Sequence, residues 1–359
     1  MRAASDYATK SLTTRGYATK GPAARLEPFD FTRREPRPHD LSIEILYCGV
    51  CHSDIHQARD EWGGSIFPMV PGHEIVGTVS KVGNKVEKWK VGDTVGVGCF
   101  VDSCRECDAC KAGEEQYCER GMIPTYNGYE RDGKTPTYGG YSTGITVDEN
   151  YLLRIPDNIP LDRAAPLLCA GITTYSPLRR FGVSSGNEVA VVGLGGLGHV
   201  AVKIAKALGA NVTVVSHSPG KCDDALQLGA DDFIATKEAG VFEKNAARFD
   251  FILDTVSAPQ DYNSYLDLLR LDGTMVLVGL PAPSPLSAGP LISGRRRLAG
   301  SMIGGIRETQ EMLDFCAAHG VASDVEVISI QQINEAYERA IKSDVRYRFV
   351  IDISSLTQS

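Results

Sequence analysis

The sequence predicts an α/β protein of two domains, one rich in β-strands and one built around a doubly wound parallel sheet. A chain of 359 residues is longer than a single hydrophobic core usually becomes. Residues 75–98 alternate apolar and polar side chains with glycines at the turns, which is typical of a coiled, barrel-like antiparallel sheet. From residue 188 onward, apolar strands alternate with amphipathic helices, and this alternation indicates a parallel sheet covered by helices.

Short strands broken by Gly and Pro predict the body of the first domain between Leu26 and Val101. A cysteine-rich loop follows at 104–118, and another strand pair ends near Pro156. The tail over 325–353 has a mixed pattern, and we expect it to return to this domain.

The pattern changes after Ile159, where the second domain should begin. Between its apolar strands, the periodicity predicts helices over 197–208, 220–228 and 261–270. A last helix over 308–319 is assigned together with the tail. The expected domains are therefore 1–160 with 305–359, and 161–304.

Composition excludes several classes of protein. The formal net charge of −8 disfavours a broad nucleic-acid surface, because neutralising phosphates requires a basic face. No apolar run approaches the roughly 20 residues of a membrane span, and the first residues lack the apolar core of a secretory signal. Ten cysteines without such a signal indicate a reducing compartment, so we expect a cytoplasmic protein. Residues 1–13 should form a short extension, with a transit peptide as the alternative.

Chemistry-bearing residues are concentrated between Cys48 and His56, directly after an apolar run. Two thiols, two imidazoles, a hydroxyl and a carboxylate in one short stretch indicate a zinc ion that takes part in chemistry, with groups that move a proton away from it. Cys51 is a candidate thiolate ligand, and His73-Glu74 offers the next pair of donors.

Catalytic zinc sites use three protein ligands and leave one position to water or substrate. Cys169, where the first domain passes into the second, is the best candidate for the distant third ligand. The alternative is that Cys169 is only a small buried apolar side chain, as free cysteines often are.

Cys104, Cys107, Cys110 and Cys118 follow the pattern C-x2-C-x2-C-x7-C. Four thiolates at this spacing can surround one tetrahedral ion and leave no open position, which predicts a structural zinc. An iron–sulfur cluster fits the spacing less well, and surrounding acidic residues disfavour a nucleic-acid module. The remaining thiols are expected to be unliganded: Cys48, Cys99, Cys222 and Cys316.

The stretch from Val189 to Gly198 is an apolar strand that runs into G-x-G-x-x-G and then into a helix. In this context the motif predicts a dinucleotide site. Gly193 permits the tight turn, Gly195 lets the backbone approach the pyrophosphate, and Gly198 lets helix and strand pack closely.

The end of the next strand favours NADP over NAD. An acidic residue there would hold a free ribose diol and repel a 2′-phosphate. The sequence instead has Ser216, Ser218 and Lys221, with no carboxylate before Asp223. Hydroxyls and an ammonium group can bind a phosphate. The alternative is a surface turn without function.

These motifs, in this order, resemble the zinc-containing medium-chain alcohol dehydrogenases, and most closely the cinnamyl alcohol dehydrogenase branch with its NADP-dependent aldehyde reductases. The resemblance rests on GVCHSD, PGHE, the four-cysteine loop, LLCAGITTYSPL and GLGGLGH, and it covers about Thr14 to Ile353. It implies a GroES-like catalytic domain and a Rossmann cofactor domain.

The resemblance also implies roles for individual residues. Cys51, His73 and Cys169 would bind the catalytic zinc, with Glu74 beside it and Asp54 orienting the histidine. The proton would pass from the substrate oxygen through Ser53 and His56 by way of the cofactor ribose.

The cofactor-binding residues that the resemblance implies form a longer set. His52 would lie near the pyrophosphate, Ser216, Ser218 and Lys221 would contact the 2′-phosphate, and His217 departs from the usual hydroxyl there. Further expected cofactor contacts are Thr173, Gly193, Gly195, Gly196, Leu197, Gly198, Thr255, Val278, Gly279, Ser301, Met302, Ile303 and Arg348, with Arg346 as an alternative to the last.

We therefore expect an NADP(H)-dependent zinc enzyme that interconverts primary alcohols and aldehydes, mainly as a reductase of aromatic or medium-length aldehydes. Trp62, Ile123, Met302 and Ile303 are candidates for its apolar substrate pocket. The alternatives are a polyol or secondary-alcohol dehydrogenase of the same superfamily and a non-catalytic protein that binds zinc and NADPH. The resemblance implies a homodimer that pairs strands around 295–303, with no nucleic-acid or membrane partner.

Overall fold

Strand pairing and packing divide the chain into a β-rich unit and a parallel-sheet unit. The computed structural model describes residues 12–357. One compact unit runs to Leu168 and resumes at Val325, and the other spans Cys169–Asp324. The predicted boundaries at 160/161 and 304/305 concern the functional domains and stay a prediction. Residues 1–11, which include most of the predicted N-terminal extension, lie outside the described part.

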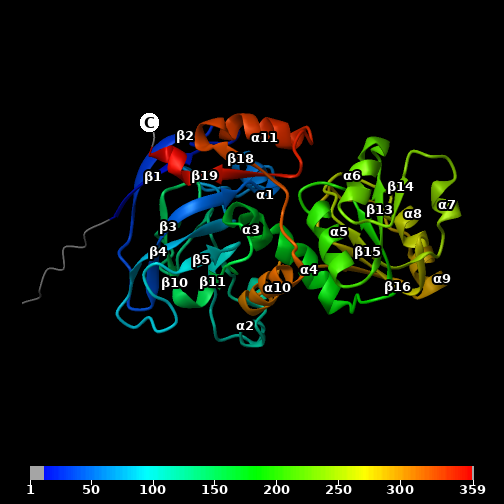
Figure 1. Ribbon diagram of the computed structural model, residues 1–359, viewed down its shortest axis with the longest axis horizontal. Helices are drawn as coiled ribbons and strands as arrows, with labels where there is room; N and C mark the ends of the chain where they lie inside the picture. Colours follow the sequence, from blue (N-terminus) through cyan, green and yellow to red (C-terminus); the bar gives the residue numbers. More distant parts are fainter. Residues whose placement is uncertain (1–11, 358–359) are drawn as a thin grey trace, which may run out of the picture. The chain divides into compact units, whose positions relative to one another are not determined.

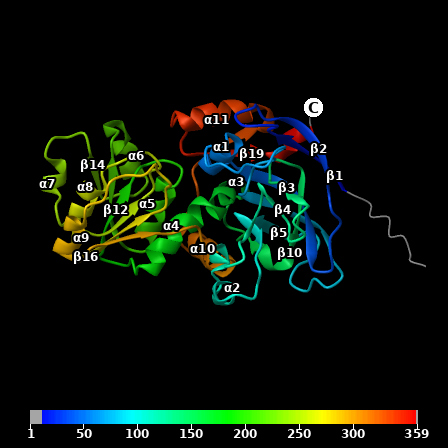
Figure 2. The ribbon, with the colours of Figure 1, turned by 180° about the vertical axis from the view of Figure 1, so that it is seen from behind.

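The first unit is organised around a seven-stranded, mainly antiparallel sheet (Figure 1). Its strands lie in the order β11-β5-β4-β3-β19-β18, and β10 also pairs with β3. The tail therefore returns to this unit, because β19 pairs antiparallel with β3 and parallel with β18. Figure 2 shows this late segment beside the early strands from the other side. The members of the sheet are β3 (Asp40–Gly49), β4 (Ile75–Val82), β5 (Thr94–Val97), β10 (Gly144–Asp148), β11 (Leu153–Arg154), β18 (Val325–Ser329) and β19 (Arg348–Asp352).

Smaller elements surround this sheet. The hairpin β1–β2 pairs antiparallel, as do β6–β7 and β8–β9. Their bounds are β1 (Leu12–Ala18), β2 (Glu27–Arg33), β6 (Phe100–Asp102), β7 (Ile123–Pro124), β8 (Gly128–Tyr129) and β9 (Pro136–Thr137). The helices of this unit are α1 (His52–Ala58), α2 (Asp108–Ala112), α3 (Leu161–Ala164) and α11 (Ile333–Ile341).

The core of the first unit lies between the sheet and the segments that cross it. β3 and β4 contribute apolar side chains to this core, and both strands are buried at consecutive positions over part of their length. The fully buried members include Leu41, Ile43, Ile75, Val95, Leu153 and Phe349. This packing holds the carboxyl end of β3, where the candidate ligands begin, in a fixed position.

The second unit contains a six-stranded sheet, parallel throughout, with the order β14-β13-β12-β15-β16-β17. Strand order reverses between β12 and β15, the position at which such sheets bind ligands. A cluster that includes Val192, Phe249, Ile252 and Met275 forms its apolar core. The strands are β12 (Glu188–Val192), β13 (Asn211–Ser216), β14 (Asp232–Ala235), β15 (Phe249–Asp254), β16 (Leu269–Leu277) and β17 (Arg297–Gly300).

The helices of the second unit agree with the periodicity, with differences at their ends. The predicted helices correspond to α5, α6, α8 and α10, and each of the first three is shorter than predicted. The sequence did not predict α4, α7 or α9 of this unit. α7 and α9 have four and seven residues, which give too few repeats of the helical period. α4 is buried along most of its length, so it lacks the polar face on which a periodic pattern depends. The bounds are α4 (Ala170–Arg180), α5 (Gly198–Ala207), α6 (Cys222–Gln227), α7 (Val241–Lys244), α8 (Tyr262–Asp267), α9 (Ala288–Gly294) and α10 (Ile306–His319).

Over residues 12–357, no helix combines the length and the apolar character needed to cross a membrane.

Candidate metal and cofactor sites

Four buried side chains converge on one point at the carboxyl end of β3. Cys51 is the N-cap of α1, His73 and Glu74 directly precede β4, and Cys169 follows Leu168 as the N-cap of α4. One potential ligand atom from each of these four residues lies within 4.8 Å of the others. Two thiols, an imidazole and a carboxylate at this spacing form a donor set suited to zinc. The predicted distant ligand Cys169 is thus brought to the other three.

Asp54 organises this cluster from the first turn of α1. Its Oδ2 accepts from the backbone N–H of Cys51 at 2.8 Å and from the Tyr141 hydroxyl at 3.2 Å. Its Oδ1 lies 3.1 Å from both the Gly72 nitrogen and His73 Nδ1. A proton on His73 Nδ1 leaves Nε2 as the metal-binding atom, which is how a carboxylate orients a ligating histidine. Burial acts to lower the pKa of His73, but Asp54 and its other neighbours raise it well above the ordinary value.

Glu74 lies between the donor cluster and a buried arginine of β19. Its Oε1 accepts a hydrogen bond from Arg348 Nη2, whereas its Oε2 is buried with no hydrogen-bond partner among the described residues. Burial raises the pKa of Glu74 to about 8, and the Arg348 charge opposes that shift. A cation at the cluster would compensate the carboxylate on its second side, so this orphaned oxygen fits a metal site.

Gly49 makes room for the Glu74 carboxylate. A Cβ added at Gly49 would lie 1.9 Å from Glu74 Oε2. No side chain tolerates such a contact, so this position requires glycine for a reason unrelated to its backbone conformation.

The predicted proton-transfer residues lie on α1 beside the cluster. Ser53 Oγ is 3.6 Å from Cys51 Sγ. His56 Nδ1 lies 2.5 Å from Glu61 Oε2, and the His56 ring stacks on Trp62 with centroids 4.9 Å apart. His56 is therefore held by two contacts that orient its ring.

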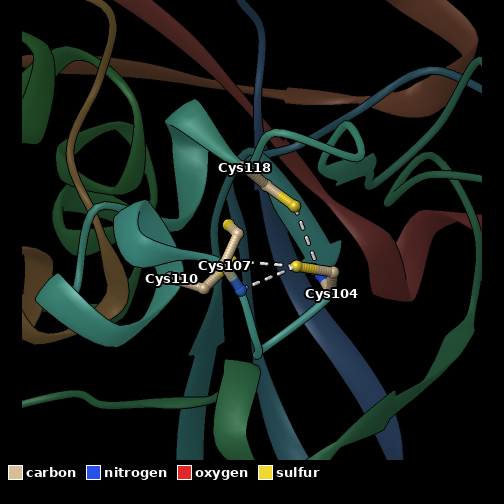
Figure 3. Close-up of side chains that lie close together, drawn as sticks. All are labelled: Cys104, Cys107, Cys110 and Cys118. Carbon is tan, nitrogen blue, oxygen red and sulfur yellow. Dashed lines mark hydrogen bonds between the residues drawn. The ribbon is translucent and has the colours of Figure 1, made fainter.

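The four-cysteine loop gathers its sulfur atoms around one point (Figure 3). The sulfurs of Cys104, Cys107, Cys110 and Cys118 lie within 4.8 Å of one another. Backbone N–H groups of Cys104 and Cys107 each donate to a sulfur of the set at 3.3 Å. The left-handed Arg105 and the short helix α2 bend the chain so that both ends of the loop reach the same point.

The electrostatics of this loop also fit a cation. Backbone N–H groups of Glu106 and Cys107 lower the pKa of Cys104 to about 6, whereas burial raises the pKa of Cys110 to about 11. A divalent ion is needed for all four sulfurs to be thiolates at once, and the four occupy every tetrahedral position. The donor set therefore fits structural zinc.

The dinucleotide loop has the geometry that its glycines predict. Gly193 follows β12 with φ +88°, and a Cβ at Gly198 would lie 2.0 Å from the Gly193 carbonyl oxygen. The Thr255 hydroxyl, directly after β15, donates to the Val192 carbonyl at 2.8 Å and holds the turn. A Cβ at Gly195 would meet no atom within 4 Å, so the backbone there is open to a ligand. Helix α5 begins at Gly198, and its N-terminal N–H groups suit a phosphate.

The segment after β13 contains the residues predicted to distinguish NADP from NAD. Ser216 ends the strand, and its Oγ accepts from the Ser218 N–H at 3.2 Å. Ser218 Oγ lies 3.2 Å from Nε2 of the exposed His217, and Lys221 Nζ donates to the Leu194 carbonyl at 2.8 Å. Lysine, hydroxyls and imidazole thus cluster beside the glycine loop, with no carboxylate at the end of the strand.

The other predicted cofactor residues belong to both units. His52 is on α1, where burial lowers its pKa, and Arg348 is occupied by Glu74. The remaining predicted cofactor residues all lie in the second unit: Thr173, Gly196, Leu197, Val278, Gly279, Ser301, Met302 and Ile303. Their contacts with a cofactor remain a prediction, as do those of Arg346.

The candidate pocket residues belong to both units: Trp62 and Ile123 to the first, Met302 and Ile303 to the second. Trp62 is 43% exposed and Met302 is 41% exposed. Ile123, in β7, lines a cavity that none of the cluster residues Cys51, His73 and Cys169 lines. The assignment of Ile123 to the substrate pocket stays a prediction.

Three functional contacts were missed by sequence reasoning. Glu61, which contacts His56, lies five residues after it and beyond the end of α1, and an acid at this spacing from a histidine is a weak signal. The Tyr141 hydroxyl reaches Asp54 from a residue 87 positions away, and the Arg348–Glu74 pair spans 274 positions. Residues so far apart along the chain cannot be paired from a local sequence pattern.

Comparisons with known proteins agree with this geometry. Residues 37–157 match the alcohol dehydrogenase GroES-like domain, and residues 196–318 match the zinc-binding dehydrogenase domain. The chain is 60% identical over 346 residues to NADP-dependent alcohol dehydrogenase C 1 of Mycolicibacterium smegmatis, covering 96% of this chain and 99% of that protein. It is 54% identical to an aldehyde reductase of Escherichia coli, covering 95% and 97%.

A solved structure shows the same fold. A cinnamyl alcohol dehydrogenase from Sorghum bicolor superposes with a TM-score of 0.93 at 47% identity, covering 96% of this chain and 98% of that one. The predicted fold class, a GroES-like domain with a Rossmann-type parallel-sheet domain, is thereby confirmed. The chain belongs to the zinc-containing alcohol dehydrogenase family.

Proposed function

We propose that this chain interconverts primary alcohols and aldehydes with zinc and NADP(H), and that it works mainly as a reductase of aromatic or medium-length aliphatic aldehydes. The enzyme class and NADP agree with the relatives, which are an NADP-dependent alcohol dehydrogenase and an aldehyde reductase, and zinc agrees with the matched zinc-binding dehydrogenase domain. The observation that carries the proposal is the buried Cys51, His73, Glu74 and Cys169 cluster in a chain that also forms the dinucleotide loop.

Cys51, His73 and Cys169 would hold the catalytic zinc, with Glu74 adjacent. When bound, zinc polarises a carbonyl oxygen and stabilises an alkoxide near neutral pH. Asp54 keeps His73 in the tautomer that presents Nε2, and the buried pair of Glu74 with Arg348 adds a fixed charge beside the ligands. Cys104, Cys107, Cys110 and Cys118 would hold the second, structural zinc.

Ser53 and His56 would carry the proton. The Ser53 hydroxyl lies next to the ligand Cys51, where it can donate to a substrate oxygen during aldehyde reduction. His56, on the same helix, can resupply that proton from the protein surface. Glu61 accepts from His56 Nδ1 and so orients the ring, while Trp62 covers one of its faces.

NADP preference rests on the turn after β13. Ser216, Ser218 and Lys221 supply hydroxyl and ammonium donors, and the exposed His217 adds an imidazole where the branch usually has a hydroxyl. With no carboxylate at the strand end, a 2′-phosphate meets no repulsion there. Trp62 and Met302 remain candidates for the rim of the substrate pocket.

We also propose a homodimer in the cytoplasm. β17 pairs with β16 and has no second partner among the described strands, so it is an edge that another copy can extend. Ile292 on the adjacent α9 is 77% exposed, and Leu280 is 66% exposed. Burial of such side chains favours association. Light scattering after gel filtration should give twice the mass of one chain.

A direct assay tests the proposed activity. Zinc-loaded protein is incubated with a panel of aromatic and aliphatic aldehydes, with NADPH and NADH side by side, and cofactor oxidation is followed by absorbance. Cys51→Ser should abolish turnover while NADPH binding persists. Cys222→Ser, which alters a thiol outside both donor groups, is the matched control and should keep activity. No oxidation of either cofactor by the fully metallated protein would refute the proposal.

A further inference from the structure

The first unit contains a cavity of about 220 Å³ that the proposed activity does not use. Its walls come from four places: the end of β2 and the connection to β3, the start of the four-cysteine loop, β7 with the following Thr125, and β10 with the β8–β9 hairpin. None of Cys51, His73 and Cys169 lines it. The cavity is therefore distinct from the catalytic cluster.

Positive charge exceeds negative charge in these walls. Five arginines and four carboxylates line the cavity. Each carboxylate is engaged by arginines other than Arg33: Asp40 by Arg34, Glu130 by Arg34 and Arg37, and both Asp102 and Asp148 by Arg105. Arg131 also lies 3.7 Å from Asp102. The excess charge is that of Arg33, which has no carboxylate within ion-pair distance among the described residues.

Arg33 is held in place by neutral groups. Its Nε donates to the Gly144 carbonyl at 2.6 Å, and its Nη2 donates to the Gly139 carbonyl at 3.1 Å and to Ser142 Oγ at 3.2 Å. The guanidinium carbon lies 5.0 Å from the centroid of the Phe31 ring. Nη1 has no hydrogen-bond partner among the residues that the structure describes. The side chain is thus oriented without its charge being neutralised.

The charge persists although burial disfavours it. Burial lowers the pKa of Arg33 to about 9, so the guanidinium still carries its proton at neutral pH. An oriented, desolvated cation without a counter-charge costs free energy, and an anion that enters the cavity recovers part of that cost. Thr137 and Tyr138 add hydroxyl groups to the same walls.

We propose that this cavity binds a small oxyanion of the phosphate class, free or as the phosphate group of a small metabolite, with Arg33 as its principal ligand. The planar guanidinium matches phosphate oxygens, and the space exceeds that of a single water. Arg105, between Cys104 and Cys107, forms part of the wall, so the bound anion contacts the structural metal loop. Binding should therefore slow the loss of zinc from that loop.

Titration with inorganic phosphate at constant ionic strength tests the site. Glycerol phosphate, a phosphate ester, is titrated in parallel, and chloride controls for the effect of anions in general. Calorimetry and the rate of zinc release to a chelator are the readouts. In the unaltered protein we expect saturable phosphate binding and slower zinc release. Tighter binding of the ester identifies a phosphorylated metabolite as the occupant, and equal or tighter binding of phosphate identifies the free ion.

Two variants distinguish specific phosphate binding by Arg33 from non-specific attraction of phosphate to positive charge. Arg33→Gln should weaken phosphate binding at least tenfold, whereas Arg37→Gln, which removes the same charge from a side chain that is 54% exposed, should change it less than threefold. Equal losses in both variants, or no saturable binding in the unaltered protein, would overturn the proposal.

A measurement on the unaltered protein covers the case in which Arg33→Gln does not fold. Crystals soaked in selenate are examined by anomalous scattering. Selenium within the cavity beside Arg33 supports the site, and selenium found only elsewhere on the protein overturns it. Neither readout depends on aldehyde reduction, so failure of this proposal and failure of the proposed activity are distinguishable.

Discussion

Replacing Asp54 by Asn should loosen the catalytic cluster without changing its volume. Asp54 is fully buried and accepts from four donors, two at each oxygen. Asparagine keeps one acceptor oxygen and places an NH₂ group against the other pair of donors. Two buried donors then lose their acceptor, at about 1–3 kcal/mol each, which gives a loss of about 2–6 kcal/mol in the free energy of unfolding.

The same substitution should weaken zinc binding. Asp54 holds His73 Nδ1 at 3.1 Å and the backbone of the ligand Cys51 at 2.8 Å. Loss of a carboxylate that orients a ligating histidine typically costs about 10–100-fold in metal affinity. We expect a comparable fall in zinc affinity at this cluster, and the four-cysteine loop should keep its own zinc.

Two assays check these magnitudes. Urea denaturation gives the free energy of unfolding, and competition with a chromophoric chelator gives the affinity of each zinc. Asp157→Asn, at an exposed turn of the same unit, is the control and should change stability by no more than about 0.5 kcal/mol. If Asp54→Asn matched this control in both assays, the assigned role of the carboxylate would be wrong.

Three further predictions concern the rest of the chain. Gly198→Ala places a Cβ 2.0 Å from the Gly193 carbonyl, so NADPH binding measured by fluorescence should weaken at least about tenfold, while Gly220→Ala, with open space around its Cβ, should not. Ser216→Asp should lower NADPH affinity and raise NADH affinity, and unchanged cofactor preference would contradict the proposed phosphate contacts. Burial raises the pKa of Asp254 from 3.8 to about 6, so the folded state binds this proton more tightly than the unfolded state. Its contribution to stability should therefore fall by about 3 kcal/mol as pH rises from about 3 to about 7, and urea denaturation of Asp254→Asn should lack that decline.

Much of the fold was predictable because its signals are local. The alternation of apolar and polar residues over 75–98 and the strand–helix alternation after residue 188 are both patterns among neighbouring residues. The G-x-G-x-x-G loop was predictable for a similar reason. Gly193 and Gly198 are required by close contacts within one strand–turn–helix unit. Short helices such as α1 escaped prediction because one or two turns show too little periodicity.

The candidate site was only partly accessible from sequence. Cys51, His73 and the four-cysteine loop were identified from ligand type and spacing. Cys169 lies 96 residues beyond His73, so it was a candidate only from its place where the first domain passes into the second, with a buried apolar thiol as the alternative. Arg348 Nη2 donates to Glu74, a contact the sequence did not suggest, and the expected position of Arg348 near the pyrophosphate stays a prediction. A buried carboxylate beside a donor cluster needs a cation, and β19 supplies one from the far end of the chain.

The sequence by itself determined the two architectures, the kinds of ligand and the dinucleotide loop, because each depends on residue type and short-range spacing. Tertiary structure alone decided how those ligands are supported. Pairing of β3 with β19 brings Arg348 to Glu74, the segment before β10 brings Tyr141 to Asp54, and the end of β2 places Arg33 in a charged cavity. These contacts join residues far apart along the chain, so they exist only when strand pairing and core packing have fixed the distances between them.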